Sequence, residues 1–201
     1  MGKLIAVLSL VVLLIPGVAS ANLLTNPGFE TGNLNGWSVD WNTGNQHISA
    51  LNPQSGSFGA RNEFDGGMYQ QINGVVGNTQ YQLTGYSYVP TGGALSDWGS
   101  YIGLKFFNAD GNELINYQVD TQNLTRGVYN LADTGLVLAP AASAYAQARF
   151  GTWANLGTTP AKPTDFDTFD LEGQVVPEPT SLLLLGSGLV GLVGLTKKRK
   201  A

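Results

Sequence analysis

Cysteine is absent from all 201 residues of the chain, which excludes a disulfide framework, a thiolate zinc site, an iron–sulfur cluster and a cysteine nucleophile. Any structural cross-link would therefore have to be a metal ion bound by oxygen atoms. Histidine occurs once, as His47, which argues against a Ser/His/Asp triad and against a multi-histidine metal centre. These absences point away from an enzyme, and the length suits one domain with flanking processing segments.

Basic residues are scarce in the middle of the chain. The body at residues 22–176 contains five of the ten Lys and Arg residues and thirteen of the fourteen Asp and Glu residues. Its net charge is therefore near −8. Nucleic-acid binding requires Lys and Arg side chains that neutralise phosphates. We therefore expect no nucleic-acid partner, and the carboxylates of the body remain available to a cation.

The N-terminus has the three parts of a secretory signal. Lys3 precedes an apolar run over residues 4–15, and Ala19-Ser20-Ala21 forms an A-x-A cleavage pattern. A transmembrane anchor is disfavoured because twelve apolar residues are too few to span a bilayer. The sequence predicts a signal peptide over residues 1–21, export through the secretion machinery, and a mature chain that begins at Asn22.

The C-terminus combines an uncharged segment with a basic tail. Residues 181–196 carry no charge, and residues 197–200 are all Lys or Arg. Sixteen residues at about 1.5 Å each reach roughly 24 Å, somewhat less than a hydrocarbon core of roughly 30 Å. The segment predicts a short transmembrane helix, and the four cations favour a cytoplasmic tail with the body of the protein outside.

The residues before this segment indicate which kind of C-terminal membrane signal it is. Pro177-Glu178-Pro179, the glycine-interrupted apolar segment and the basic tail together resemble a PEP-CTERM sorting signal. That resemblance implies a Gram-negative bacterium that makes exopolysaccharide, with a membrane exosortase that cuts the chain near the tripeptide. It also implies anchoring in the inner membrane before processing, followed by a cell-surface or extracellular location. A plain tail anchor is the alternative.

The body between these signals alternates with the period of β-strands. Apolar and polar residues alternate over 80–89, 101–107 and 144–151, and residues 108–112 between the second and third of these form a turn that contains Gly111. No window of similar length has apolar residues at a helical period. The sequence therefore predicts one antiparallel β-sandwich over residues 22–175, with helices short or absent.

Several segments of the body resemble the galactose-binding-like jelly rolls found in many carbohydrate-binding modules. The segments occur in the family's order at residues 22–30 followed by 36–37, then 55–60, 67–81, 110–111 and 166–171, and the first reads Asn-Leu-Leu-Thr-Asn-Pro-Gly-Phe-Glu. This resemblance implies a jelly roll whose first and last strands lie side by side.

In that family a structural Ca²⁺ is often held where the two terminal strands meet. Transferred by position, the carboxylate ligands would be Glu30 and Asp167, with backbone carbonyls near Asn26 and Ser55 as weaker candidates. Calcium binds six to eight oxygen atoms, and it could tie together the two ends of a chain that has no disulfide. The alternative is that both carboxylates are solvated or cap nearby backbone groups.

Aromatic residues in polar surroundings are the candidates for sugar binding. An aromatic ring can stack on the apolar face of a sugar while neighbouring polar side chains bind its hydroxyls. The expected surface consists of Trp41, Tyr86, Tyr88, Trp98, Arg149 and Trp153. Edge packing is the alternative for each of them, and a packing role is expected for Trp37.

Acidic residues give little support for catalysis. Asp165, Asp167 and Asp170 lie on one predicted strand, whereas glycoside hydrolysis needs two acids placed across a substrate cleft. The sequence therefore predicts a non-catalytic, exported protein that binds carbohydrate and associates with exopolysaccharide or a biofilm matrix. The alternative is a structural or adhesive matrix protein that makes protein contacts and binds no sugar.

Overall fold

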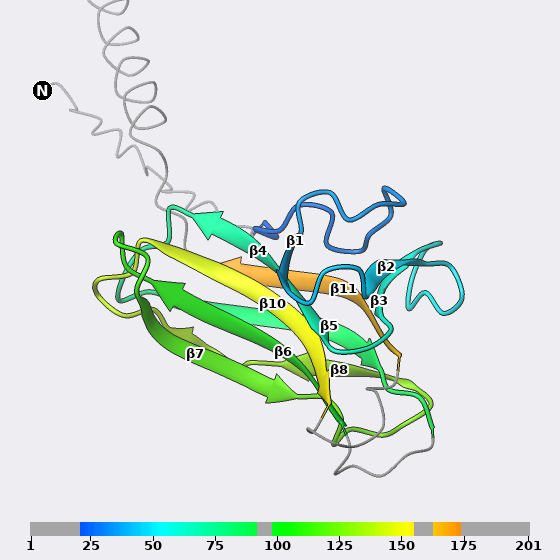
Figure 1. Ribbon diagram of the computed structural model, residues 1–201. Helices are drawn as coiled ribbons and strands as arrows, with labels where there is room; N and C mark the ends of the chain where they lie inside the picture. The colour runs from blue at the N-terminus through cyan, green and yellow to red at the C-terminus, as the bar shows by residue number, and fades with distance from the viewer. Residues whose placement is uncertain (1–20, 92–97, 155–162, 174–201) are drawn as a thin grey trace, which may run out of the picture.

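The computed structural model of the chain describes residues 21–91, 98–154 and 163–173. The predicted signal peptide up to residue 20, the sorting tripeptide, the predicted transmembrane helix over 181–196 and the basic tail lie outside the described residues. The described residues form strands and turns and contain no helix, as the alternating pattern predicted. The strands build two antiparallel sheets, which Figure 1 shows lying one behind the other.

The first sheet has five strands. Its order is β1-β4-β10-β6-β7, so that β10 lies at its centre. The strands are β1 (Ser38–Trp41), β4 (Gly66–Asn73), β6 (Trp98–Phe107), β7 (Glu113–Asp120) and β10 (Tyr145–Ala154). All four neighbouring pairs are antiparallel.

The second sheet has six strands. Its order is β2-β3-β11-β5-β8, and β9 pairs with β5 beside β8. The strands are β2 (Gln46–Ser49), β3 (Gly59–Asn62), β5 (Gln80–Tyr88), β8 (Tyr129–Asp133), β9 (Val137–Leu138) and β11 (Thr164–Gly173). The predicted antiparallel β-sandwich is thus confirmed.

The core lies between the sheets and follows the alternation seen in the sequence. The inward positions of β6 and β10 are fully buried, at Ile102, Leu104, Phe106, Ala146, Ala148 and Phe150. Trp37 packs into an aromatic cluster, with its ring centroid 5.5 Å from Phe29, 5.2 Å from Phe150 and 5.3 Å from Phe169. The expected packing role of Trp37 is therefore observed.

The two ends of the described body lie side by side. The backbone N–H of Leu23 donates to the carbonyl of Leu171 at 3.0 Å. The Asn22 side chain donates to the carbonyl of Phe169 at 2.8 Å and accepts from the N–H of Leu171 at 3.1 Å. The start of the body is therefore fixed to the last strand, as the jelly-roll resemblance implied.

Candidate functional site

The outward side of the five-stranded sheet collects aromatic rings. Because Ala148 and Phe150 face the core, Arg149 and Trp153 point away from it. The register places Trp41 opposite Gly67, Gly67 opposite Gly151, and Gly151 opposite Tyr101. We call the group formed by Trp41, Tyr101, Arg149 and Trp153 the aromatic face; Tyr101 is only 5% exposed, so the half-buried Trp41 and Trp153 supply its accessible rings.

Glycines make room for the rings of the aromatic face. A Cβ added at Gly99 would collide with the indole of Trp153, and one at Gly67 would collide with the indole of Trp41. A Cβ at Gly151 would lie 2.9 Å from Cε1 of Tyr101, which is closer than real contacts allow. The rings therefore lie directly against the backbone of the sheet, where no side chain separates them from it.

Polar contacts fix the rings relative to one another. The centroids of Tyr101 and Trp153 are 5.8 Å apart, and the indole of Trp41 donates a hydrogen bond to the Tyr101 hydroxyl. The guanidinium carbon of Arg149 lies 5.9 Å from the Tyr101 ring centroid, and Arg149 forms an ion pair with Asp40. Such a cation over a ring is electrostatically favourable. The aromatic face is thus a fixed arrangement of rings beside a paired charge.

Burial changes the ionisation of two groups on the aromatic face. Desolvation raises the pKa of Tyr101, and the hydrogen bond from Trp41 offsets part of this effect. Desolvation also lowers the pKa of Arg149, whose guanidinium nevertheless remains charged at neutral pH. Tyr101 is therefore a neutral, largely buried hydroxyl next to a permanent cation.

One member of the aromatic face, Tyr101, and the ion-pair partner of another, Asp40, were missed in the sequence. Tyr101 could have been found because it precedes Ile102 in an alternating strand and so belongs to the outward phase. Asp40 gave no such signal, since its contact with Arg149 joins strands that are far apart in the chain. The ion pair depends on the β1-β4-β10 order of the sheet.

The expectation of one six-residue sugar-binding surface is wrong in its geometry. Tyr86 and Tyr88 lie on β5, so they face outward from the six-stranded sheet, whereas Trp41, Arg149 and Trp153 belong to the five-stranded sheet. Tyr88 packs on Tyr129, with ring centroids 5.6 Å apart. Trp98 begins β6, and its side chain lies outside the described part of the chain. A strand's period cannot tell which sheet the strand will join.

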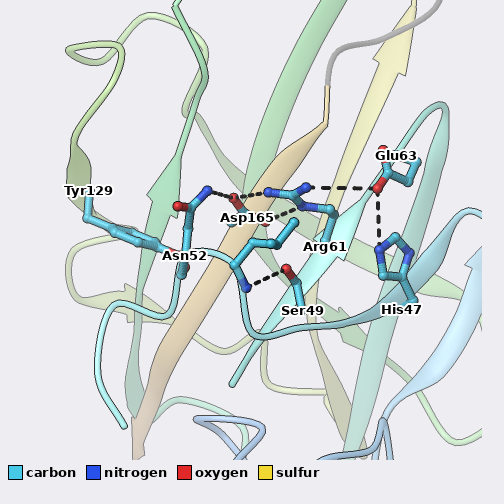
Figure 2. Close-up of polar contacts among 8 residues, drawn as sticks. His47, Ser49, Asn52, Arg61, Glu63, Tyr129 and Asp165 are labelled. Carbon is cyan, nitrogen blue, oxygen red and sulfur yellow. Dashed lines mark hydrogen bonds and ion pairs between the residues drawn. The ribbon is translucent and has the colours of Figure 1, made fainter. Parts of the chain in front are cut away.

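A polar cluster occupies the outward side of β3 and β11 (Figure 2). Arg61 donates from Nε to Oδ1 of Asp165 at 2.6 Å and from Nη2 to Oδ2 at 2.8 Å. Asn52 donates to the same carboxylate at 3.2 Å, and its backbone carbonyl accepts from the Tyr129 hydroxyl. These contacts fasten the loop between β2 and β3 onto the sheet. The ion pair with Asp165 is the main factor that raises the pKa of Arg61.

The exposed margin of this cluster contains the single histidine of the chain. Nε2 of His47 lies 3.3 Å from Oε1 of Glu63, and that oxygen lies 4.0 Å from Nη1 of Arg61 (Figure 2). His47 lies on β2 with about half of its side chain exposed.

The two expected calcium ligands point toward one loop. The buried carboxylate of Asp167 accepts hydrogen bonds from the N–H groups of Gln54 at 2.8 Å and Ser55 at 3.2 Å. The carboxylate of Glu30 accepts from the N–H groups of Ser57 and Phe58 at 3.0 to 3.1 Å. Gly28 lies near both side chains, because a Cβ there would lie 3.8 Å from Oδ1 of Asp167 and 3.9 Å from Cγ of Glu30.

Charge and burial decide whether a cation would suit this place. Burial raises the pKa of Asp167, and hydrogen bonds from Ser55, Gln54 and Thr168 counter the effect. Within the described ranges, Asp167 has no ion-pair partner, and no group of three or more His, Cys, Asp or Glu residues forms a metal cluster. Both carboxylates already cap backbone N–H groups, as the alternative expectation stated, and a divalent ion, whose remaining ligands would have to be carbonyl oxygens or water, stays a prediction.

Asp165 and Asp167 of β11 already have structural contacts. Asp165 is paired with Arg61, and Asp167 accepts three backbone hydrogen bonds. Both lie on the same strand, so they do not face each other across a cleft as the acids of a glycosidase must. The absence of catalysis stays a prediction.

The segment that follows the body matches a known family model. Residues 175–200 match the model of the PEP-CTERM protein-sorting motif. The chain carries a PEP-CTERM sorting motif. The motif indicates export and a membrane-anchored C-terminal sorting signal of the kind found in Gram-negative bacteria. Residues 21–91, 98–154 and 163–173 contain no helix that could span a membrane. The PEP-CTERM segment lies outside these ranges.

Solved structures share the fold of the body that precedes the PEP-CTERM motif. The CBM22-2 xylan-binding domain of Paenibacillus barcinonensis Xyn10C superposes with a TM-score of 0.56 at 13% identity, over 74% of this chain and 98% of that domain. TmCBM61, solved with β-1,4-galactotriose, gives a TM-score of 0.53 at 19% identity, over 77% of this chain and 100% of that module. These similarities show that the body has the β-sandwich fold of those carbohydrate-binding modules.

The same fold also occurs within a larger viral protein. The enzymatically active domain of bacteriophage CBA120 tailspike protein 4 superposes with a TM-score of 0.59 at 12% identity. The match covers 76% of this chain but only 21% of the tailspike chain. No curated protein sequence matches the chain.

Proposed function

We propose that this protein is exported, processed by an exosortase and bound to extracellular polysaccharide through its aromatic face. The motif at residues 175–200 supports the sorting part of this proposal. The sugar-binding part is supported by similar β-sandwiches described as a xylan-binding domain and as a complex with β-1,4-galactotriose.

The observation that carries the proposal is the packing of Trp41, Tyr101 and Trp153 over glycines of the five-stranded sheet. Aromatic rings that stay fixed before binding lose little conformational freedom when a sugar stacks on them. Arg149 and Asp40 lie beside the rings and offer hydrogen-bond donors and acceptors to hydroxyl groups. The aromatic face therefore has the two kinds of group that sugar recognition needs.

Affinity electrophoresis tests the sugar-binding part. The protein is run through native gels that contain either no polysaccharide, plant polysaccharides, or the exopolysaccharide of its host. We expect retardation by at least one polysaccharide and its loss in Trp41→Ala. A protein that migrates equally in every gel would instead support a structural or adhesive matrix role through protein contacts.

The sorting part has its own test. We expect a membrane-bound precursor that becomes shorter by cleavage near Pro177-Glu178-Pro179 when the host's exosortase is present. Replacing Glu178 with Ala should leave the precursor in the inner membrane, where fractionation and mass spectrometry of the C-terminus would detect it. Processing that continues unchanged in a host without exosortase would contradict this part alone.

A structural calcium ion is part of the same proposal. Glu30 and Asp167 would be its carboxylate ligands, and the ion would neutralise the buried charge of Asp167. A bound ion would also link the segment that contains Glu30 to the last strand. The geometry that supports this assignment is the approach of both side chains to Gly28 and of both carboxylates to the loop at residues 54–58.

A further inference from the structure

One end of the sandwich exposes an uncharged stretch of chain. Residues 134–144 contain no charged side chain and include β9. Leu136 is 66% exposed and Leu138 is 53% exposed, and Ala141 and Ala142 are exposed beside them. Large exposed apolar side chains that gather in one place mark a surface that contacts another apolar phase.

A second uncharged loop lies against this stretch. The N–H of Asn78 donates to the carbonyl of Ala139 at 2.8 Å, and the N–H of Ala139 donates to the carbonyl of Thr79 at 2.9 Å. Gly77 approaches Ala141 so closely that a Cβ at Gly77 would collide with the Ala141 carbonyl. Residues 74–79 are also uncharged. We call the surface formed by residues 74–79 and 134–144 the apolar end.

One of the acidic residues that border the apolar end is held in place by hydrogen bonds. The carboxylate of Asp133 accepts from Nε2 of Gln82 at 2.8 Å and from the N–H of Gly135 at 2.7 Å. The carboxylate of Asp133 therefore points toward its own turn and toward β5. The leucines that follow it are separated from that charge by the turn.

The chain leaves the body at the apolar end. Gly173, the last described residue, pairs with Tyr81 of β5, and Tyr81 pairs on its other side with Val137 of β9. Figure 1 shows the arrowheads of β4 and β11 at the same end of the sandwich. The eight residues from Gly173 to Ser181 can span at most about 29 Å, at 3.3 to 3.6 Å each. The tether between the body and the uncharged segment at 181–196 is therefore short.

From this arrangement we infer that the apolar end rests on the lipid bilayer while the sorting signal is still attached. Leu136 and Leu138 enter the boundary between headgroups and acyl chains, as the apolar residues of peripheral membrane proteins do. The inference depends on the membrane-anchored sorting signal and is independent of sugar binding. If the protein binds no sugar, the inference about the lipid bilayer still stands, and if the apolar end does not touch lipid, the proposal of sugar binding still stands.

The aromatic face lies toward the opposite end of its sheet. Trp153 is eight residues beyond Tyr145 on β10, which corresponds to roughly 26 Å at about 3.3 Å per residue. Tyr145 directly follows the apolar end. An anchored molecule in this orientation holds the aromatic face away from the lipid, where a polysaccharide can reach it.

Fluorescence quenching tests the orientation, and the absence of cysteine makes single labelling simple. Leu138→Cys and the control Phe64→Cys introduce one thiol each at apolar residues of similar exposure, 53% and 48%. Phe64 lies at the far end, where its carbonyl accepts a hydrogen bond from Thr152. Each full-length variant is labelled with a nitrobenzoxadiazole probe and reconstituted into vesicles of phosphatidylethanolamine and phosphatidylglycerol.

Doxyl-labelled lipids should quench the probe at position 138 severalfold more than the probe at position 64, and aqueous iodide should show the reverse order. Equal quenching at both positions, or release of the chain from the vesicles by alkaline carbonate, would overturn the inference. As a second measurement, Leu136→Ser with Leu138→Ser should abolish lipid quenching of a probe at Ala141→Cys. These two changes should leave the melting temperature unchanged, because both side chains are exposed. Lipid quenching that persists in this double variant would also count against the inference.

Discussion

Removal of one charge from the Arg61–Asp165 pair is expected to cost much of the stability of the fold. Asp165 is 2% exposed and Arg61 is 14% exposed, and two hydrogen bonds of 2.6 and 2.8 Å join them (Figure 2). Asp165→Asn keeps the size of the side chain but leaves a largely buried guanidinium without its main partner. Loss of one member of a buried pair typically costs about 3 to 5 kcal/mol.

The lower end of this range applies here because Arg61 retains some exposure and has Glu63 at 4.0 Å. A loss of about 3 kcal/mol corresponds to a fall of about 6 to 12 °C in the melting temperature of a domain of this size. Thermal melts and urea titrations of Asp165→Asn measure the change, and the urea slope should stay constant if only stability is altered.

The matched control is Glu113→Gln, which removes an ion pair of similar length. Lys105 and Glu113 are 2.7 Å apart, but Glu113 is 44% exposed. A solvent-exposed pair contributes about 0 to 1 kcal/mol. If Asp165→Asn cost no more than Glu113→Gln, the view that the polar cluster fastens the loop between β2 and β3 would be refuted.

Three further predictions follow from glycine packing, tyrosine burial and calcium. Gly99→Ala should displace the Trp153 indole, the group whose atoms a Cβ at Gly99 would collide with, and weaken polysaccharide retardation, with circular dichroism confirming that the β-sandwich still forms. Burial raises the pKa of Tyr101 and of Tyr129 in the folded protein above the ordinary value of 10.0. These tyrosines lose their protons at a lower pH in the unfolded chain than in the folded protein. The free energy of unfolding should therefore be unaffected below pH 10 and should fall as the pH rises from 10 through the higher folded pKa. Urea titrations at several pH values would measure this change. Calcium at a hundredfold excess over its Kd adds about 2.7 kcal/mol, so chelation should lower the melting temperature by several degrees in the wild type but not in Asp167→Ala.

The sequence predicted the strands because their alternation is local. The segments at 80–89, 101–107 and 144–151 place apolar side chains on one side, and the structure buries that side in β5, β6 and β10. The turn at 108–112 was predictable for the same reason. Gly111 has a φ of 84°, and Asn108 accepts hydrogen bonds from the N–H groups of Asp110 and Asn112.

The assembly of the candidate site was not predictable from alternation. The pattern shows which residues share one side of a strand, but it does not show which sheet the strand joins. Tyr86 and Arg149 have the same outward phase, yet β5 and β10 belong to different sheets. The contact between Asp40 and Arg149 likewise requires β1 and β10 to flank β4, which is a property of the whole topology.

The central claim is that polysaccharide binds to the aromatic face, and a comparison of two alanine variants tests it most directly. Trp153→Ala removes a ring from the aromatic face, and Tyr86→Ala removes a ring of the same outward phase from the other sheet. The dissociation constant for the retarding polysaccharide should rise about tenfold in Trp153→Ala, which corresponds to about 1.4 kcal/mol, and stay unchanged in Tyr86→Ala. Equal affinity in the two variants, or a loss confined to Tyr86→Ala, would contradict the account.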